Sequence, residues 1–245
     1  MGLVETGTVP TGAVSARTEP NGVSLIVSAS LALLLRRLLP AASSAVVPIT
    51  VDDTVHPEEA PLVEGAVALR RREFAAGRRA ARAALAAVGR DSEGPLLPDP
   101  DGVPRWPSGV VGSISHAHRW AIAAVSSRDR CAALGVDLEE AAGLPEELIP
   151  WVLTRAERDV AVDDQRVFAR QVFCIKEAVY KCIFPFARVP FDFHDVEVTV
   201  QDERFTATIH ALAASPIRVV VGHIGLAEGH FVATTSLSPL SPSPS

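Results

Sequence analysis

The strongest constraint on the fold is a pattern that occurs twice along the chain, in which a long helical segment is followed by about three short strands. Residues 57–88 read as a helix that is broken once, and apolar residues at spacings of three and four predict an amphipathic helix over 163–184, ending before Pro185. The expected strands are 110–115, 120–127 and 131–139 after the first helix, and 196–200, 205–211, 217–225 and 230–237 after the second. This repetition predicts an α+β fold with two similar halves that meet near 128–140.

The predicted organisation has four parts: a disordered extension over 1–28, an N-terminal α+β half over 29–130, a C-terminal α+β half over 131–237, and a disordered Ser/Pro-rich tail over 238–245. The apolar run at 23–35 has 13 residues, fewer than the ~20 that span a bilayer, so we expect no membrane association. The net charge of −6 gives no indication of a nucleic-acid partner. Three cysteines without a CxxC spacing favour a reducing cytoplasmic location over a disulfide framework or a zinc site.

The segment GVDLE places two carboxylates on one side of a strand. Asp137 and Glu139 point the same way in an extended chain, and Leu138 points into the core. Two neighbouring carboxylates repel each other unless water, a metal ion or a cationic side chain compensates their charge. One interpretation is an acidic strand end that turns into a loop. The other is a Mg²⁺ site with oxygen ligands, to which Glu177 would contribute a third carboxylate from the long helix.

The cationic residues of the chain are distributed unevenly. Lys176 and Lys181 are the only lysines, and both flank Glu177. Glu177 and Lys181 have the spacing of an exposed helical ion pair, which contributes only ~0.2–0.5 kcal/mol. Six of the arginines lie within 70–82, where they form either a solvated basic face or a phosphate-binding surface. Ser113, Ser115 and His116 follow at a strand end, and a lone histidine there is more often structural than catalytic.

Four segments, RREFAAGR, GSISH, GVDLE and FCIKEAVYK, occur in this order. In order and spacing they resemble the 4′-phosphopantetheinyl transferases of the surfactin-synthetase and siderophore type. That family carries a (I/V)G(I/V)DxE motif and, some 40 residues later, a (W/F)xxKEAxxK motif. Here 38 residues separate Glu139 from Glu177 and both motifs are complete. The resemblance covers residues 31–235.

The resemblance implies an enzyme that transfers phosphopantetheine from coenzyme A to a serine of an apo carrier protein, of the peptidyl, acyl or polyketide type, and releases 3′,5′-ADP. Asp137, Glu139 and Glu177 would hold Mg²⁺ on the pyrophosphate of coenzyme A. Glu177 would also be the base for the serine, directly or through a water. Lys181 would neutralise the charge of the leaving group.

The resemblance further implies that Arg70, Arg78 and His116 grip the phosphates of coenzyme A, with Ser115 beside them and Lys176 lining the same pocket. One departure concerns the loop LLPDPDGVPRWP, where relatives often carry a lysine and Arg105 is the only cation. The implied architecture is a pseudo-two-fold pair of halves, each with a small antiparallel sheet on a long helix, and a site in the cleft between them. A chain of this length is expected to act as a cytoplasmic monomer, typically in secondary metabolite biosynthesis.

Two other functions are compatible with the same residues. A Mg²⁺-dependent nucleotide or pyrophosphate hydrolase would use water in place of the carrier serine. A non-catalytic module would bind a carrier or a nucleotide, but an inactive copy would be free to lose any of Asp137, Glu139, Glu177 and Lys181, and all four are present.

Overall fold

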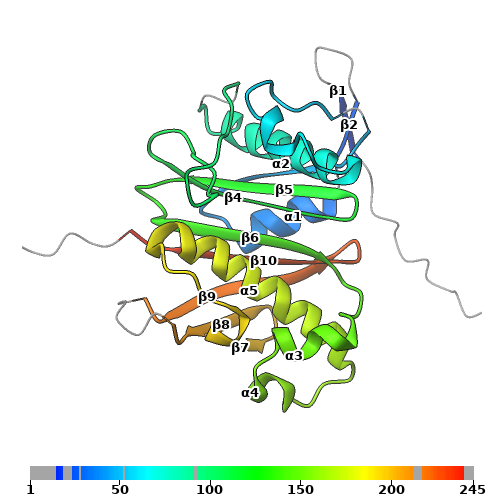
Figure 1. Ribbon diagram of the computed structural model, residues 1–245, viewed down its shortest axis with the longest axis vertical. Helices are drawn as coiled ribbons and strands as arrows, with labels where there is room; N and C mark the ends of the chain where they lie inside the picture. Colours follow the sequence, from blue (N-terminus) through cyan, green and yellow to red (C-terminus); the bar gives the residue numbers. More distant parts are fainter. Residues whose placement is uncertain are drawn as a thin grey trace, which may run out of the picture.

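A computed structural model describes residues 15–18, 24–27, 29–51, 53–90, 93–211 and 217–239. Two antiparallel sheets lie one above the other in the view of Figure 1, and each carries one long helix. This arrangement confirms the predicted α+β fold with two halves. Among the described residues, no helix combines the length and the apolar character that crossing a membrane requires.

The first sheet has three strands in the order β3-β5-β4 and is covered by helix α2. Its elements are β3 (Ser43–Pro48), β4 (Val110–Ala117), β5 (Trp120–Ser127) and α2 (Ala68–Ala86). A short 3-10 turn, η1 (Ala60–Val63), precedes α2, so the break expected within 57–88 is present. Strand β3 was not predicted; it pairs with β5 and completes this sheet.

The second sheet has five strands in the order β6-β10-β9-β8-β7, with helix α5 packed on it. Its elements are β6 (Ala133–Glu140), β7 (Val196–Gln201), β8 (Arg204–Ile209), β9 (Val219–Ala227), β10 (His230–Leu237) and α5 (Gln165–Ala187). The connections contain η2 (Glu146–Leu148), α3 (Ile149–Val152), α4 (Arg155–Arg158) and η3 (Phe193–Asp195). The strand expected at 131–139 belongs to this sheet, because it pairs with β10.

Helix α5 begins and ends at recognisable caps. The Asp164 carboxylate accepts hydrogen bonds from the backbone N–H groups of Arg166 and Val167, and Arg188 closes the helix in a left-handed conformation. The prediction that the helix ends before Pro185 is wrong by one turn. A proline in the last turn removes one terminal hydrogen bond only, so the helix continues to its cap.

Strand β6 separates two layers of the core. Leu134, Val136 and Leu138 pack with helix α1 (Ala29–Leu38), which lies behind the sheets in Figure 1. Gly135 and Asp137 alternate with them and lie on the side of α5. Strands β4 and β6 are joined by serine hydroxyls, since Ser113 Oγ accepts from the Val136 N–H at 3.1 Å and Ser115 Oγ from the Leu138 N–H at 3.3 Å. The pleat of β6 thus presents its acids to the junction of the two halves.

The two ends of the chain lie largely outside the described residues. Within the expected disordered extension of 1–28, the structure describes only β1 (Ser15–Thr18) and β2 (Ser24–Val27), which pair as an antiparallel ribbon. The rest of that expectation, and the expectation for 240–245, concern residues that the structure does not describe.

Candidate active site

A pocket of about 560 Å³ lies where α2, β4, β6 and α5 meet. Eight of the nine predicted site residues line it, namely Arg70, Arg78, Ser115, His116, Asp137, Glu139, Glu177 and Lys181. The arginines come from α2, the serine and histidine from β4, two acids from β6, and the last pair from α5. Residues separated by up to 111 positions therefore surround one cavity.

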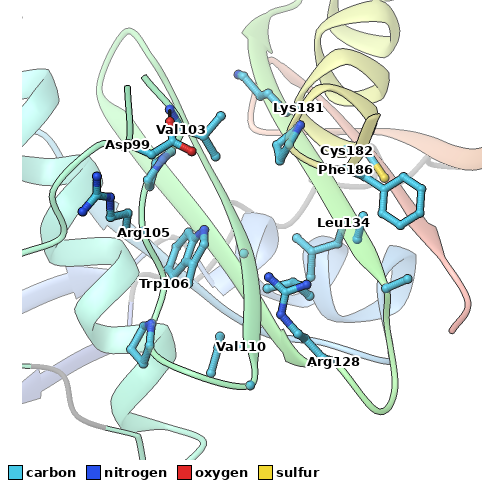
Figure 2. A pocket seen from close by; sticks show the side chains of 18 of the residues that line it. Asp99, Val103, Arg105, Trp106, Val110, Arg128, Leu134, Lys181, Cys182 and Phe186 are labelled. Carbon is cyan, nitrogen blue, oxygen red and sulfur yellow. Dashed lines mark hydrogen bonds between the residues drawn. The ribbon is translucent and has the colours of Figure 1, made fainter. Parts of the chain in front are cut away.

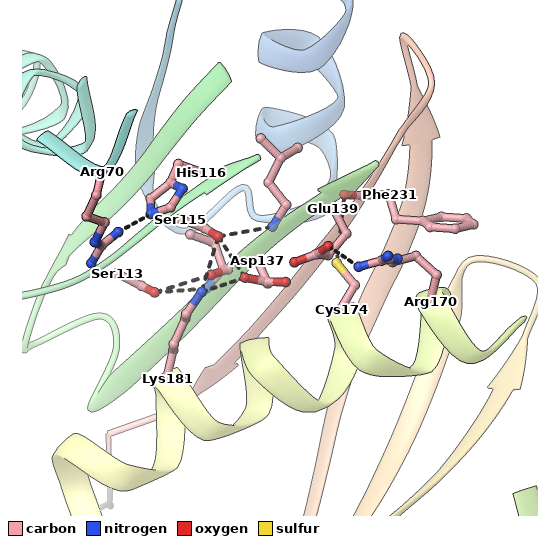
Figure 3. A network of polar contacts seen from close by, with 12 residues as sticks. Arg70, Ser113, Ser115, His116, Asp137, Glu139, Arg170, Cys174, Lys181 and Phe231 are labelled. Atoms are coloured by element: carbon pink, nitrogen blue, oxygen red, sulfur yellow. Dashed lines mark hydrogen bonds and ion pairs between the residues drawn. The ribbon is translucent and has the colours of Figure 1, made fainter. Parts of the chain in front are cut away.

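Asp137 is the centre of a polar network (Figure 3). Its Oδ1 accepts hydrogen bonds from Ser115 Oγ at 2.7 Å and from Lys181 Nζ at 2.5 Å. Its Oδ2 is buried and has no partner. Desolvation lowers the pKa of Lys181, but the charge of Asp137 and its hydrogen bond outweigh this and raise the pKa above its usual value. Lys181 therefore pairs across the junction with the strand, and is not the exposed helical partner of Glu177 that its spacing allowed.

Glu139 and Glu177 lie in a desolvated, negatively charged environment. Burial, reinforced by the charge of Asp137, raises the pKa of Glu139 to about 7, although Arg170 Nη1 donates to its carboxylate at 2.8 Å. Burial also raises the pKa of Glu177, with Lys181 opposing and Asp137 reinforcing the change. Both carboxylates would gain from a nearby cation that restores their ionised form.

The donor set suits a hard divalent cation. Four carboxylates line the pocket, of which three are the predicted ligands Asp137, Glu139 and Glu177, and Asp137 Oδ2 is buried without a partner. Among the residues that the structure describes, no three histidine, cysteine or acidic side chains converge closely enough to form a metal site. In this arrangement Lys181 and Arg170 neutralise Asp137 and Glu139 instead. The residues fit Mg²⁺ by chemistry, and they line a single cavity.

The opposite wall of the pocket is basic. Arg70 Nη1 lies 2.8 Å from His116 Nε2, which must be the acceptor because a guanidinium only donates (Figure 3). Burial lowers the pKa of His116; Glu73, 3.8 Å from its Nδ1, opposes the change and Arg70 adds to it. The Arg78 guanidinium lies over the Phe74 ring, 4.5 Å from its centre. Neutral His116 and two guanidinium groups form a surface suited to phosphate.

Lys176 does not line this pocket, contrary to its predicted place. Its side chain is 1% exposed, and its Nζ donates to Glu157 Oε2 at 2.7 Å, to the Val152 carbonyl at 2.8 Å and to the Phe193 carbonyl at 2.7 Å. The Glu157 carboxylate also accepts from the N–H groups of Thr154 and Val198. Lys176 is therefore a buried anchor for α4 and β7, on a different side of α5 from Lys181.

The only cation of this loop, Arg105, is one of the residues that line a second cavity of about 480 Å³, with Trp106, Arg128 and Phe186 (Figure 2). The loop gives the first pocket Pro98, Gly102 and Pro104, none of which carries charge. Lys181 borders both cavities. Arg105 therefore does not line the first pocket, and supplies no loop cation to it.

Comparison with known proteins identifies the family of the chain. A family model described as the 4′-phosphopantetheinyl transferase N-terminal domain matches residues 58–126, and one described as the 4′-phosphopantetheinyl transferase superfamily matches residues 133–235. The chain belongs to this superfamily. The first match covers α2, β4 and most of β5, and the second covers β6, α5 and most of the five-stranded sheet, so both walls of the pocket lie inside the matched regions.

Curated relatives of the transferase agree with this assignment. The chain is 37% identical to the 4′-phosphopantetheinyl transferase Svp of Streptomyces mobaraensis over 166 residues, which is 66% of this chain and 67% of the relative. It is 33% identical to PptT of Mycobacterium tuberculosis over 189 residues, 71% of this chain and 82% of the relative. It is 34% identical to Npt of Nocardia iowensis over 176 residues, which is 69% of this chain and 78% of the relative. The protein is a 4′-phosphopantetheinyl transferase, an enzyme of a family that uses coenzyme A and acts on apo carrier proteins.

Several residues of the transferase site were not predicted. Glu73, Phe74 and Phe173 line the pocket, and Arg170 pairs with Glu139. Arg170 precedes Glu177 by seven residues, about two helical turns, so the helical period alone places both residues on the same face of the helix and could have predicted Arg170 as a site residue. Behind the pocket, the Glu59 carboxylate is buried and accepts hydrogen bonds from Arg82 Nη2 and the Leu96 N–H.

Proposed function

We propose that the transferase moves 4′-phosphopantetheine from coenzyme A to a serine hydroxyl of an apo peptidyl, acyl or polyketide carrier protein, depends on Mg²⁺, and releases 3′,5′-ADP. The observation that carries the proposal is the single pocket in which Asp137, Glu139, Glu177 and Lys181 face Arg70 and His116. A pyrophosphate between two charged walls needs positioning and charge neutralisation more than covalent catalysis.

In the proposed reaction, the serine hydroxyl loses its proton to a Glu177 carboxylate oxygen, directly or through a water. The serine oxygen bonds to the phosphorus that carries the pantetheine arm, and the bond from that phosphorus to the bridging oxygen breaks. The negative charge that develops on the departing 3′,5′-ADP faces the Lys181 ammonium. The raised pKa of Glu177 supports its role as a base, because it brings the carboxyl closer to the operating pH.

Bound Mg²⁺ would supply charge neutralisation at the pyrophosphate, and Asp137, Glu139 and Glu177 would hold it. Arg70, Arg78 and His116, with Ser115 beside them, would hold the phosphates of coenzyme A. Lys176 has no part in this proposal, because its ammonium is enclosed by Glu157 and two backbone carbonyls.

The test is mass spectrometry of an apo carrier protein incubated with the enzyme, coenzyme A and Mg²⁺. Transfer adds one phosphopantetheine to the carrier, and a chelator in excess of Mg²⁺ prevents the mass gain. Cleavage of coenzyme A without a carrier would instead support the hydrolase alternative. A panel of apo carriers of the three types would identify the preferred partner.

We also propose that the enzyme is a cytoplasmic monomer. A single chain supplies every wall of the pocket, which supports function without a second copy. The three cysteines are free and buried, as suits a reducing compartment. Sedimentation equilibrium and cell fractionation test the two statements separately.

A further inference from the structure

Arg78 differs from the other predicted phosphate ligand of α2 in its burial. Its side chain is 10% exposed, whereas that of Arg70 is 53% exposed. Burial lowers the pKa of Arg78, and the neighbouring Arg82 and Arg70 lower it further, whereas the charge of Glu59 raises it. A buried guanidinium is costly unless a counter-charge lies close by.

Glu59 supplies this counter-charge from the turn before η1. Its side chain is 0% exposed, and its Oε1 lies 3.8 Å from Arg78 Nε. That distance is too long for a hydrogen bond, so Glu59 acts on Arg78 through charge. The same Oε1 accepts from Arg82 Nη2 and from the Leu96 N–H, each at 2.7 Å. These two donors hold the carboxylate in place.

The arrangement orients the Arg78 guanidinium. Glu59 lies against its Nε, and the Phe74 ring covers one face at 4.5 Å. Arg78 and Phe74 both line the pocket, and Glu59 does not. We propose that Glu59 is a positioning residue, which aims Arg78 at a phosphate group of coenzyme A and so sets the affinity for that substrate. The inference rests on the proposed binding of coenzyme A in this pocket.

Glu59 also fixes the loop that closes the pocket. The N–H of Leu96 donates to Glu59, and Leu96 is buried in the core against α2. The loop then continues to Pro98, Gly102 and Pro104 at the pocket wall. One carboxylate therefore contacts both a cation of the site and the start of the loop that lines it.

A double-mutant cycle on Glu59 and Arg78 tests the proposal, with the dissociation constant of 3′,5′-ADP measured by titration calorimetry. Glu59→Gln keeps the shape and an acceptor but removes the charge. It is expected to weaken binding by about tenfold, the scale of one charge-assisted contact. The double variant Glu59→Gln/Arg78→Ala is expected to have a dissociation constant within about twofold of that of Arg78→Ala alone, because Glu59 acts on the ligand only through Arg78. The KM for coenzyme A should rise in parallel while kcat stays within about threefold.

Glu157→Gln is the matched control. Glu157 is equally buried and accepts from two backbone N–H groups and one cation, but it lies outside the pocket. It should lower the melting temperature and leave the 3′,5′-ADP affinity unchanged. If Glu59→Gln does not fold, Glu59→Asp, which keeps the charge but withdraws it, replaces it in the cycle, with a smaller loss of affinity expected.

The outcomes separate this inference from the proposed function. Unchanged affinity in the Glu59 variant, or losses that add fully to those of Arg78→Ala, would overturn the positioning role. If the wild-type enzyme modified no apo carrier, the proposed function would fail, and the calorimetric cycle would still report on the positioning of Arg78. If the wild-type enzyme and Arg78→Ala bound 3′,5′-ADP equally, the assumed phosphate contact itself would be wrong, and the inference with it.

Discussion

The most informative single change is Lys176→Met. The ammonium of Lys176 is 1% exposed and donates to Glu157 and to the carbonyls of Val152 and Phe193. Methionine preserves much of the volume but leaves the Glu157 carboxylate buried without its cation. Breaking a buried ion pair from one side costs about 3–5 kcal/mol, which is a large part of the roughly 5–15 kcal/mol that stabilises a typical domain.

Denaturation with urea at constant ionic strength measures this loss, and calorimetry should show a melting temperature lower by roughly 6–20 °C for a chain of this size. The double variant Lys176→Met/Glu157→Gln should recover part of the loss, because no charge is then left unpaired. Below its melting temperature, Lys176→Met should keep the KM for coenzyme A within about twofold. A loss of stability under about 1 kcal/mol, or a KM raised tenfold, would refute the assignment of Lys176 as a buried anchor.

Three further predictions concern the pocket and its frame. Asp137→Ala and Glu177→Ala should abolish carrier modification while circular dichroism stays native, although Asp137→Ala should also lower the stability because it leaves Lys181 without its ion-pair partner; near-normal turnover in either would contradict their roles. Lys181→Arg should reduce kcat at least about tenfold with little change in stability, since a guanidinium is bulkier than an ammonium; full activity would count against a need for the amine. Gly135→Ala should destabilise the fold by more than about 2 kcal/mol in urea denaturation, because its Cβ would lie 1.9 Å from the Ala178 carbonyl oxygen; a native stability would show that α5 can shift.

The site residues were predictable where the period of a strand or a helix alone determines which way a side chain points. Asp137 and Glu139 share a strand face, so their common orientation follows from the pleat alone. The same reasoning could have placed Lys176 correctly. Five helical residues correspond to about 140° of rotation, so Lys176 and Lys181 cannot share a face of one helix. The shared motif suggested a shared pocket, and the helical geometry contradicts it.

Long-range pairings were not predictable. Strand β6 follows β5 closely, yet it pairs with β10, which lies about 100 residues later, because strand pairing depends on the whole sheet and not on neighbours in sequence. Glu59 and Glu157 belong to the same class. Each has a position near a helix start where an acid favours the helix locally, and Glu157 forms a capping box with Thr154. Neither role reveals that the carboxylate also serves as a buried counter-ion.

The absence of a side chain at Gly135 means that α5 rests directly on the backbone of β6, with main chain touching main chain. This backbone contact therefore sets the distance between the two acids on β6 and Glu177 on α5, and the packing of the surrounding apolar side chains has less influence on it. Protein engineers could change the exposed surface of α5 to favour other carrier proteins without moving the acidic residues and Lys181 in the pocket. Any alteration at this one contact would instead move every reacting group on the helix at once.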